Sequence, residues 1–259
     1  MELPIFHVDA FTDRVFAGNP AAVVILKEWL PDATMQAIAA ENNLSETAFV
    51  VTGGAEFGLR WFTPTVEVDL CGHATLASAA VLFRHGYART APVVFRYAEG
   101  TLSVGREGDL LVMDFPARIA EPAAPDAAIA AALGAAPREL HRAYDALAVF
   151  ATQQELEALR PEFAALERCD VPALIATAPG RDCDFASRYF APRYGIPEDP
   201  VTGSAHCTLI PYWSRRLGRK RLHARQMSRR GGELFCEDRG ARVTISGRAV
   251  LYLKGTITM

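Results

Sequence analysis

The sequence has few lysines and no long hydrophobic run, and each shortage excludes a class of protein. Only three lysines (Lys27, Lys220 and Lys254) are present, so a pyridoxal Schiff base would have few attachment points. The longest uncharged apolar stretches, such as residues 74–83, fall well short of the roughly 20 residues that a membrane span needs. These shortages favour a cofactor-free protein that does not span a membrane.

The five cysteines form no pattern typical of a disulfide framework or a structural zinc site. They are odd in number, scattered and without a C-x-x-C pair: Cys71, Cys169, Cys183, Cys207 and Cys236. Residues 1–6 show no basic start followed by an apolar segment and a cleavage site. We therefore expect reduced thiols, a cytoplasmic location and no metal site.

Charge and motif content argue against polyanion and nucleotide ligands. The chain has 259 residues, 50% of them hydrophobic, which is enough for a core and one or two domains. Lys+Arg number 27 against 30 Asp+Glu, so the formal net charge is only -3. Neither G-x-G-x-x-G nor G-x-x-x-x-G-K-[ST] occurs. We expect no nucleic acid, no membrane and no nucleotide cofactor as partners.

An internal repeat divides the chain. Residues 57–64 and 185–192 share the pattern F-x-x-R-aromatic-F-x-P. After a slip of three residues the match continues, with Gly72-His73-Ala74 against Gly203-Ser204-Ala205. The repeat predicts two similar halves.

The pattern of each half predicts an α+β fold with two pseudo-symmetric halves, each a curled, mostly antiparallel sheet wrapped around a central apolar helix. The central helices are expected at residues 74–83 and 205–213. We place the N-terminal half at 1–117 and the C-terminal half at 118–247, and leave open whether the final strand, 248–259, joins the first half. Strands are expected at 5–10, 21–26, 47–51, 57–62, 93–97, 101–106, 110–115, 232–236, 241–246 and 250–257. Further helices are expected at 32–42, capped by Asp32, at 126–133, ending at Gly134, and after Thr152, which with Glu155 makes a capping-box pattern.

The starts of the two central helices are candidate anion sites. Gly72-His73 and Gly203-Ser204 put small residues and side-chain donors beside free backbone N–H groups. If a pseudo-two-fold axis relates the halves, both starts face one cleft and can hold a carboxylate or an enolate-like charge. The alternative is that each glycine only eases the backbone into a helix.

Glu46 is a candidate proton carrier. It precedes residues 47–51, a run with apolar residues on both strand faces, so its carboxylate is expected to be partly desolvated. Desolvation raises the pKa of a carboxyl group toward a range that suits proton transfer. A solvated glutamate at the start of a strand is the alternative.

His73, Asp199 and Cys71 are the other titratable candidates. His73 can carry a proton or donate to a substrate carboxylate, or it can be structural. Asp199 occupies the matching region of the repeat, although a turn before Pro200 explains it equally. Cys71 at a helix start can act as a base. Its equivalent in the second half is Thr202, which disfavours a racemase with two thiols.

Residues 214–232 carry eight Lys or Arg residues without interleaved aromatics. A nucleic-acid patch is one reading. A solvated face, or partners for acidic residues in a subunit contact, explains the stretch more economically. Within it, only Arg230, beside Gly231-Gly232, is placed as a ligand contact.

Several motifs, in their order and spacing, resemble the PhzF-like phenazine-biosynthesis isomerase family over nearly the whole chain. They are D-A-F-T at 9–12, F-A-G-N-P-A-A-V at 16–23, N-N-L-S-E-T-A-F at 42–49, F-T-P at 62–64, G-H-A-T at 72–75, E-D-P-V-T-G-S-A-H-C at 198–207 and Q-M-S-R-R-G-G at 226–232.

The resemblance implies a diaminopimelate-epimerase-like fold with the active site in the cleft between the halves, a homodimer, and no cofactor. Glu46 corresponds to the catalytic glutamate of the family, and His73, Asp199 and Ser204 correspond to supporting catalytic residues. The matched motifs also supply the expected substrate-binding residues: Asn19, Gly72, Ala74, Thr202, Gly203, Ala205, Arg230 and Gly231.

The predicted function is a cofactor-independent isomerase that moves a proton between carbons of a small carboxylate, with Glu46 as general acid and base. The phenazine enzyme acts on a dihydro-hydroxyanthranilate, so an anthranilate-like ring is one expected substrate type. Two alternatives stay open: an amino-acid racemase or epimerase that uses Glu46 or Cys71, and a catalytically silent binding protein of the same fold.

Overall fold

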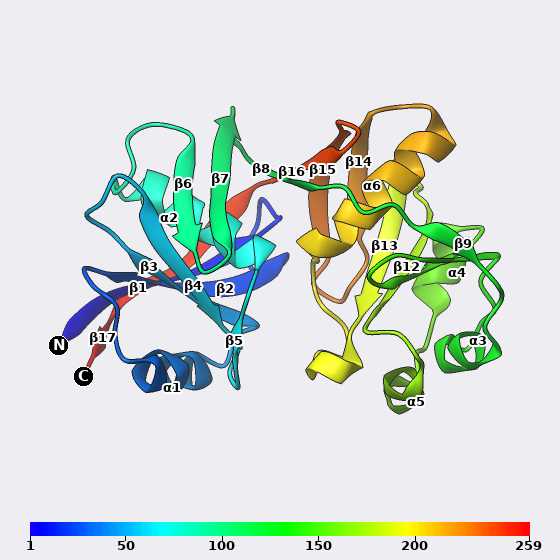
Figure 1. Ribbon diagram of the computed structural model, residues 1–259, viewed down its shortest axis with the longest axis horizontal. Helices are drawn as coiled ribbons and strands as arrows, with labels where there is room; N and C mark the ends of the chain where they lie inside the picture. Colours follow the sequence, from blue (N-terminus) through cyan, green and yellow to red (C-terminus); the bar gives the residue numbers. More distant parts are fainter. The chain divides into compact units, whose positions relative to one another are not determined.

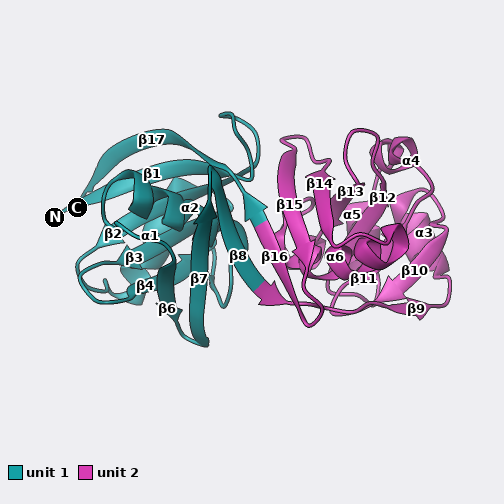
Figure 2. Ribbon diagram, turned by 90° about the horizontal axis from the view of Figure 1, so that it is seen from above, with its two compact units in different colours: residues 1–114, 246–259 teal, residues 115–245 magenta.

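The computed structural model describes residues 1–259, and the chain folds as two compact units (Figure 2). Unit 1 comprises Met1–Asp114 with Ser246–Met259, and unit 2 comprises Phe115–Ile245. Both units combine strands with few helices, which confirms the predicted α+β class (Figure 1). None of the helices combines the length and apolarity that crossing a membrane requires.

Unit 1 is a sheet with two helices. Its strands are β1 (Glu2–Ala10), β2 (Asn19–Leu26), β3 (Glu46–Val51), β4 (Phe57–Phe62), β5 (Glu67–Val68), β6 (Val93–Tyr97), β7 (Gly100–Glu107), β8 (Leu110–Pro116, leading into unit 2) and β17 (Ala249–Thr258). The helices are α1 (Asp32–Asn42) and α2 (Gly72–Arg84). The final strand, β17, pairs antiparallel with β1, with Thr258 opposite Glu2. This pairing answers the question that the sequence left open.

Unit 2 has a similar content with more short helices. Its strands are β9 (Glu121–Ala123), β10 (Glu139–Arg142), β11 (Ala146–Val149), β12 (Leu174–Pro179), β13 (Phe185–Phe190), β14 (Arg221–Gln226), β15 (Gly232–Asp238) and β16 (Arg242–Gly247, leading back to unit 1). Its helices are α3 (Ala127–Leu133), α4 (Gln153–Ala158), α5 (Phe163–Arg168), the short 3-10 helix η1 (Pro192–Tyr194) and α6 (Gly203–Leu217).

The strand pairings explain where the helices must be. In unit 1 the pairs β1/β2, β2/β3, β3/β4, β4/β6 and β6/β7 are antiparallel, parallel, antiparallel, parallel and antiparallel. In unit 2 the pairs β10/β11, β11/β12, β12/β13, β13/β14 and β14/β15 follow the same series. Because parallel neighbours need a long crossover, each parallel pair is joined through helical sequence. Helices α2 and α6 are two of these crossovers (Figure 1).

The two long crossover helices are buried as the apolar sequence predicts. Helix α2 contacts β1, β2, β3 and β17, and most of its residues are buried. Its buried hydroxyl groups donate hydrogen bonds to backbone carbonyls of the preceding turn: Thr75 to the Cys71 carbonyl at 2.6 Å and Ser78 to the Ala74 carbonyl at 2.7 Å. In α6, the indole of Trp213 donates to Thr177 Oγ1 at 2.9 Å.

The predicted helix signals are confirmed with one exception. Asp126 caps α3 by accepting from Ala128 N at 2.9 Å, and α3 ends at Gly134 in the left-handed conformation. Thr152 caps α4 by accepting from Glu155 N at 3.1 Å.

The cap predicted for Asp32 is wrong. Pro31 occupies the N-cap position of α1, and no side chain caps this helix. The Asp32 carboxylate instead accepts a hydrogen bond from Arg60 Nη1 at 2.8 Å, because the guanidinium is a stronger, charged donor than a backbone N–H.

The two arginines of the repeated motif brace the segments that lead into α2 and α6. Arg188 in β13 makes a two-pronged ion pair with Glu198 at 2.7 and 3.0 Å, and it also donates to the carbonyls of Leu156 and Leu159. Arg60 in β4 pairs with Glu67 through two contacts of 2.6 Å. The Arg188 side chain is 11% exposed and the Arg60 side chain 24%. The arginine therefore recurs in both copies of the motif because each one anchors the segment before a crossover helix.

Replacing each arginine by methionine, which keeps the apolar stem, is expected to show that the two contribute unequally to the free energy of unfolding. Arg188→Met leaves Glu198, whose side chain is 21% exposed, and the carbonyls of Leu156 and Leu159 without their partner, and lowers the free energy of unfolding by about 3 kcal/mol. Arg60→Met removes a more exposed pair and lowers it by about 1 kcal/mol or less. Urea denaturation of both variants measures this; an equal loss for the two would contradict the burial argument.

Candidate active site

Glu46 and His73 form a buried ion pair in unit 1. Glu46 is the first residue of β3 and is 9% exposed, while His73 lies in the first turn of α2 and is 6% exposed. His73 Nε2 lies 3.0 Å from Glu46 Oε2. The structure thus brings together two of the four predicted catalytic residues, and it places Glu46 in the buried setting that the apolar strand predicted.

Asn19 and Cys71 complete the surroundings of the imidazole. Asn19 Nδ2 and Cys71 Sγ lie 3.2 and 3.4 Å from His73 Nδ1, and both side chains are buried. A neutral His73 that accepts from Asn19 at Nδ1 carries its proton on Nε2, the nitrogen that lies 3.0 Å from Glu46 Oε2. Turning the amide offers Oδ1 to a protonated Nδ1 instead, so the same asparagine can serve both charge states of the ring.

Gly18 fixes the position of Asn19. It has a φ of +65°, and a Cβ built there would lie 2.1 Å from the Ala10 carbonyl oxygen. Glycine is therefore required immediately before Asn19. This accounts for the glycine of the F-A-G-N-P motif in the turn between β1 and β2.

The charges in this cluster depend on one another. Burial lowers the pKa of His73, but Cys71 and Glu46 oppose this effect and raise it well above its usual value. Burial, and then the Glu46 carboxylate, raise the pKa of the Cys71 thiol. Cys71 and Glu46 therefore both favour a charged imidazole.

Asp199 and Thr202 form a second buried polar group, in unit 2. The Thr202 hydroxyl donates to Asp199 Oδ2. Gln226, the last residue of β14, accepts from Thr202 N at 2.9 Å and donates to the Asp199 carbonyl at 2.8 Å. These bonds fix the turn that leads into α6.

Sequence reasoning missed the roles of Gln226 and Ser228. Ser228 Oγ donates to the Pro200 carbonyl at 2.8 Å and accepts from the N–H of Gly231 at 3.0 Å. Together with Gln226 it ties the Q-M-S-R-R-G-G segment to the turn that precedes α6. Both residues lie in the Q-M-S-R-R-G-G motif, from which only Arg230 and Gly231 were predicted as site residues.

The starts of α2 and α6 share one property. Neither Cys71 nor Thr202, the N-cap residues, caps its helix with a side-chain hydrogen bond. In the first turn of α6, Ser204 is exposed whereas Gly203 and Ala205 are buried. Both helices thus begin with backbone N–H groups that their N-cap side chains do not satisfy, the arrangement that suits an anion.

His206, one turn further along α6, is a fixed neutral donor. It is completely buried, and its Nδ1 lies 2.8 Å from the Thr202 carbonyl oxygen. Burial lowers the pKa of His206 to about 4, although the hydrogen bond to Thr202 opposes this. Neutral His206 therefore donates from Nδ1 and helps to hold the start of the helix.

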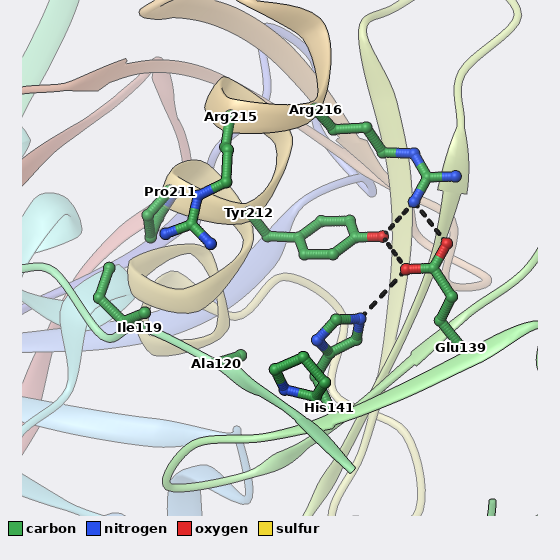
Figure 3. Close-up of a pocket in the computed structure, with 9 residues that line it drawn as sticks. Ile119, Ala120, Glu139, His141, Pro211, Tyr212, Arg215 and Arg216 are labelled. Atoms are coloured by element: carbon green, nitrogen blue, oxygen red, sulfur yellow. Dashed lines mark hydrogen bonds and ion pairs between the residues drawn. The ribbon is translucent and has the colours of Figure 1, made fainter. Parts of the chain in front are cut away.

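Several arginines of the basic stretch at 214–232 pair with acidic residues of the same chain. Figure 3 shows Arg216, Tyr212 and His141 converging on the carboxylate of Glu139, beside a pocket of about 180 Å³. The distances to Glu139 are 2.6, 3.0 and 3.1 Å. Hydrogen bonding by Arg216 is the main reason that the pKa of Glu139 is lowered to about 2. Arg219 pairs similarly with Asp184.

Taken together, the predicted residues fall into two groups. Glu46, His73 and Asn19, with Gly72 and Ala74 beside them, belong to unit 1; Asp199, Thr202, Gly203, Ser204, Ala205, Arg230 and Gly231 belong to unit 2. That both groups serve one cleft stays a prediction.

Comparison with known proteins gives concordant matches. A family model described as phenazine biosynthesis-like protein, PhzC-PhzF, matches residues 8–255. An uncharacterized isomerase of Pseudomonas aeruginosa is 53% identical over 258 residues, which cover 99% of each chain. The crystal structure of a PhzF-family phenazine biosynthesis protein from Enterococcus faecalis superposes with a TM-score of 0.98 at 45% identity and covers 100% of both chains.

A more remote match shares the fold alone. A probable proline racemase from Agrobacterium radiobacter superposes with a TM-score of 0.65 at 10% identity, covering 99% of this chain and 92% of the other. The architecture is therefore found in proteins whose sequences have diverged almost completely.

The low pKa of His206 predicts a specific loss of stability in acid. Between pH 6.5 and about 4 the unfolded chain binds a proton that folded His206 refuses, so stability falls as the pH falls. His206→Asn, whose Nδ2 occupies the position of Nδ1 and can keep the N–H donor for the Thr202 carbonyl, removes this contribution. Urea denaturation from pH 7 to pH 4 is expected to show the wild type losing stability relative to the variant; parallel curves would contradict the assignment.

Proposed function

We propose that in this chain, which belongs to the PhzC-PhzF family of phenazine biosynthesis-like proteins and is an isomerase, Glu46 is the general acid and base. The family membership that the motifs predicted is confirmed by the family match and by the relatives. The observation that carries the proposal is the buried 3.0 Å contact between Glu46 and His73.

This contact gives Glu46 two chemically different oxygens. Oε2 faces His73 Nε2, so Oε1 is the oxygen proposed to meet the substrate. The carboxylate accepts a proton from a carbon next to an activating group, and the electron pair of that C–H bond enters a conjugated, enolate-like system. The Glu46 carboxyl, whose proton exchanges with solvent while it is held there, then delivers a proton to another carbon, so the reaction is balanced without a redox step or a cofactor.

His73 is proposed to stabilise both stages of this transfer. Its raised pKa keeps positive charge beside the carboxylate before the proton moves. When Glu46 has become neutral, the imidazolium still faces the negative charge that develops on the substrate. Asn19 supports the ring at Nδ1, and we propose this positioning role for it in place of the direct substrate contact that the sequence predicted.

Substrate recognition is proposed to use the helix starts. Backbone N–H groups at Gly72, Ala74, Gly203 and Ala205 suit a carboxylate, and the hydroxyl of Ser204 and the carboxylate of Asp199 suit further polar groups. These features support a small carboxylate substrate, with anthranilate-like rings as the first class to test. Arg230 and Gly231 stay candidate contacts.

The epimerase alternative based on Cys71 is less well supported. A thiol acts as a base only as thiolate, and the pKa of Cys71 is raised. Its counterpart at the start of α6 is Thr202, whose hydroxyl is already engaged by Asp199. Glu46 is therefore the better candidate base for either a proton shift or an epimerisation.

Deuterium exchange tests the role of Glu46 across a whole class of candidate substrates. The protein is incubated in D2O with small carboxylates, including anthranilate-like rings and amino acids, and products are analysed by mass spectrometry and NMR. Glu46→Gln is expected to slow any exchange by about 100-fold to 10,000-fold, because it removes the proton acceptor. Glu41→Gln, an exposed neighbour, serves as the control.

The position of the label distinguishes the two reactions. Deuterium at a carbon that was not protonated in the substrate indicates a proton shift, and deuterium at an inverted α-carbon indicates epimerisation. A folded Glu46→Gln protein that exchanges at the wild-type rate would refute the proposed role.

A further inference from the structure

We propose that Glu46, Cys71 and His73 also form a binding site for a thiophilic divalent cation, with Zn²⁺ as the expected ion, and that the bound cation inhibits the isomerase. The three residues offer one carboxylate oxygen, one sulfur and one imidazole nitrogen, all within 4.8 Å of one another. The inhibitory part rests on the proposed function of Glu46, whereas the binding part does not.

The measured spacings suit tetrahedral coordination. His73 Nε2 lies 3.0 Å from Glu46 Oε2 and 4.0 Å from Cys71 Sγ. Zinc bonds of ordinary length impose ligand-to-ligand distances of about 3.3 to 3.6 Å. The third spacing, from Cys71 Sγ to the carboxylate oxygen, is within 4.8 Å. Seating an ion between the three atoms would need movements of about 0.5 to 1.3 Å, which rotation of the side chains can supply.

The chemistry of the donors selects the ion. Sulfur, imidazole and carboxylate together are ligands that zinc accepts and that magnesium and calcium avoid in favour of all-oxygen sites. Three protein ligands leave a fourth position for water or another small ligand, which is the composition of open zinc sites. The thiolate and the carboxylate also neutralise the charge of the cation in a buried location.

Asn19 provides the outer contact that a metal-bound histidine needs. With Nε2 on the metal, Nδ1 carries a proton and requires an acceptor. The Asn19 amide lies 3.2 Å away, and its oxygen faces Nδ1 after a turn of the amide group. The same side chain that positions His73 for proton transfer therefore also suits it for coordination.

Sequence patterns do not reveal this site because its ligands come from two elements. Glu46 begins β3, and Cys71 and His73 lie at the start of α2, which packs against β3. A search for paired cysteines tests only for structural zinc. The fold brings the third ligand to a C-x-H pair that is too short to count as a motif.

Binding follows a simple balance. The cation displaces the Cys71 thiol proton and the proton on His73 Nε2 to solvent, and it forms bonds to Sγ, Nε2 and a Glu46 oxygen. Glu46 then cannot accept a proton from carbon. No oxidant or reductant takes part.

Cobalt is the probe of choice because thiolate ligation gives it an intense near-ultraviolet charge-transfer band. Tag-free protein, stripped with chelator and kept reduced with a phosphine, is titrated with Co²⁺ and then with Zn²⁺. We expect one Co²⁺ per chain, a thiolate band, and loss of that band when Zn²⁺ displaces the cobalt. Zinc affinity is measured by competition with a chromogenic chelator.

Variants show which cysteine gives rise to the cobalt–thiolate charge-transfer band. Cys71→Ser is expected to abolish it and to weaken zinc binding by at least about 10-fold to 100-fold. Cys183→Ser, which removes a half-buried thiol hydrogen-bonded to Phe185 O elsewhere in the chain, should leave both unchanged. Glu46→Gln keeps the thiol and should weaken zinc binding as well, so the assignment does not depend on one variant folding normally; circular dichroism checks each protein.

The outcomes test zinc binding and inhibition by the bound ion separately. No thiolate band in the wild type, or a band that survives in Cys71→Ser, overturns the metal site. Zinc that binds as described but leaves deuterium exchange by the wild type unchanged overturns the inhibitory part. A fully active Glu46→Gln protein refutes the proposed function and does not affect the cobalt result.

Discussion

The ion pair between Glu46 and His73 is the interaction on which the account depends. Both side chains are buried, and a buried charge is stable only with a partner of opposite sign at close range. The contact joins the first residue of β3 to the first turn of α2, so the sheet and its crossover helix must dock accurately for either charge to be accommodated. The same requirement concentrates Asn19 and Cys71 around the imidazole. Proton transfer and metal coordination are two uses of this one arrangement.

The topology supplies that accuracy. Parallel pairing of β4 with β6 forces a crossover, and the crossover delivers α2 against β3. In unit 2 the parallel pair β13 and β14 delivers α6 in the same way, and Gln226 at the end of β14 ties the turn before α6. Arg60 and Arg188 anchor the segments that enter the two helices. The segments that lead into α2 and α6 are therefore held both by the topology and by polar contacts close in space.

Many of the strands and helices could be predicted from the sequence, because each is determined by a pattern within its own segment. Alternating and apolar runs identified most strands of unit 1, the last three strands of the chain and both buried helices, but not β9 to β14. The short motifs identified the family. Contacts between distant segments were beyond reach. Asp32 was predicted to cap α1, but its carboxylate is bound by Arg60 of β4, a residue distant in the sequence. The partnership of Glu46 with His73 and the bracing role of Gln226 depend on the packing of β3 against α2 and of β14 beside α6, which no local pattern encodes.

Titration of the His73 ring by NMR tests the central claim most directly. Histidine-labelled protein is followed across pH in the wild type and in Glu46→Gln, with the His73 signal assigned through His73→Gln. The account predicts a midpoint above 6.5 in the wild type, because the buried carboxylate supports the imidazolium, and a lower midpoint in Glu46→Gln. A wild-type midpoint at or below 6.5, or one that does not move when Glu46 is replaced, would contradict it.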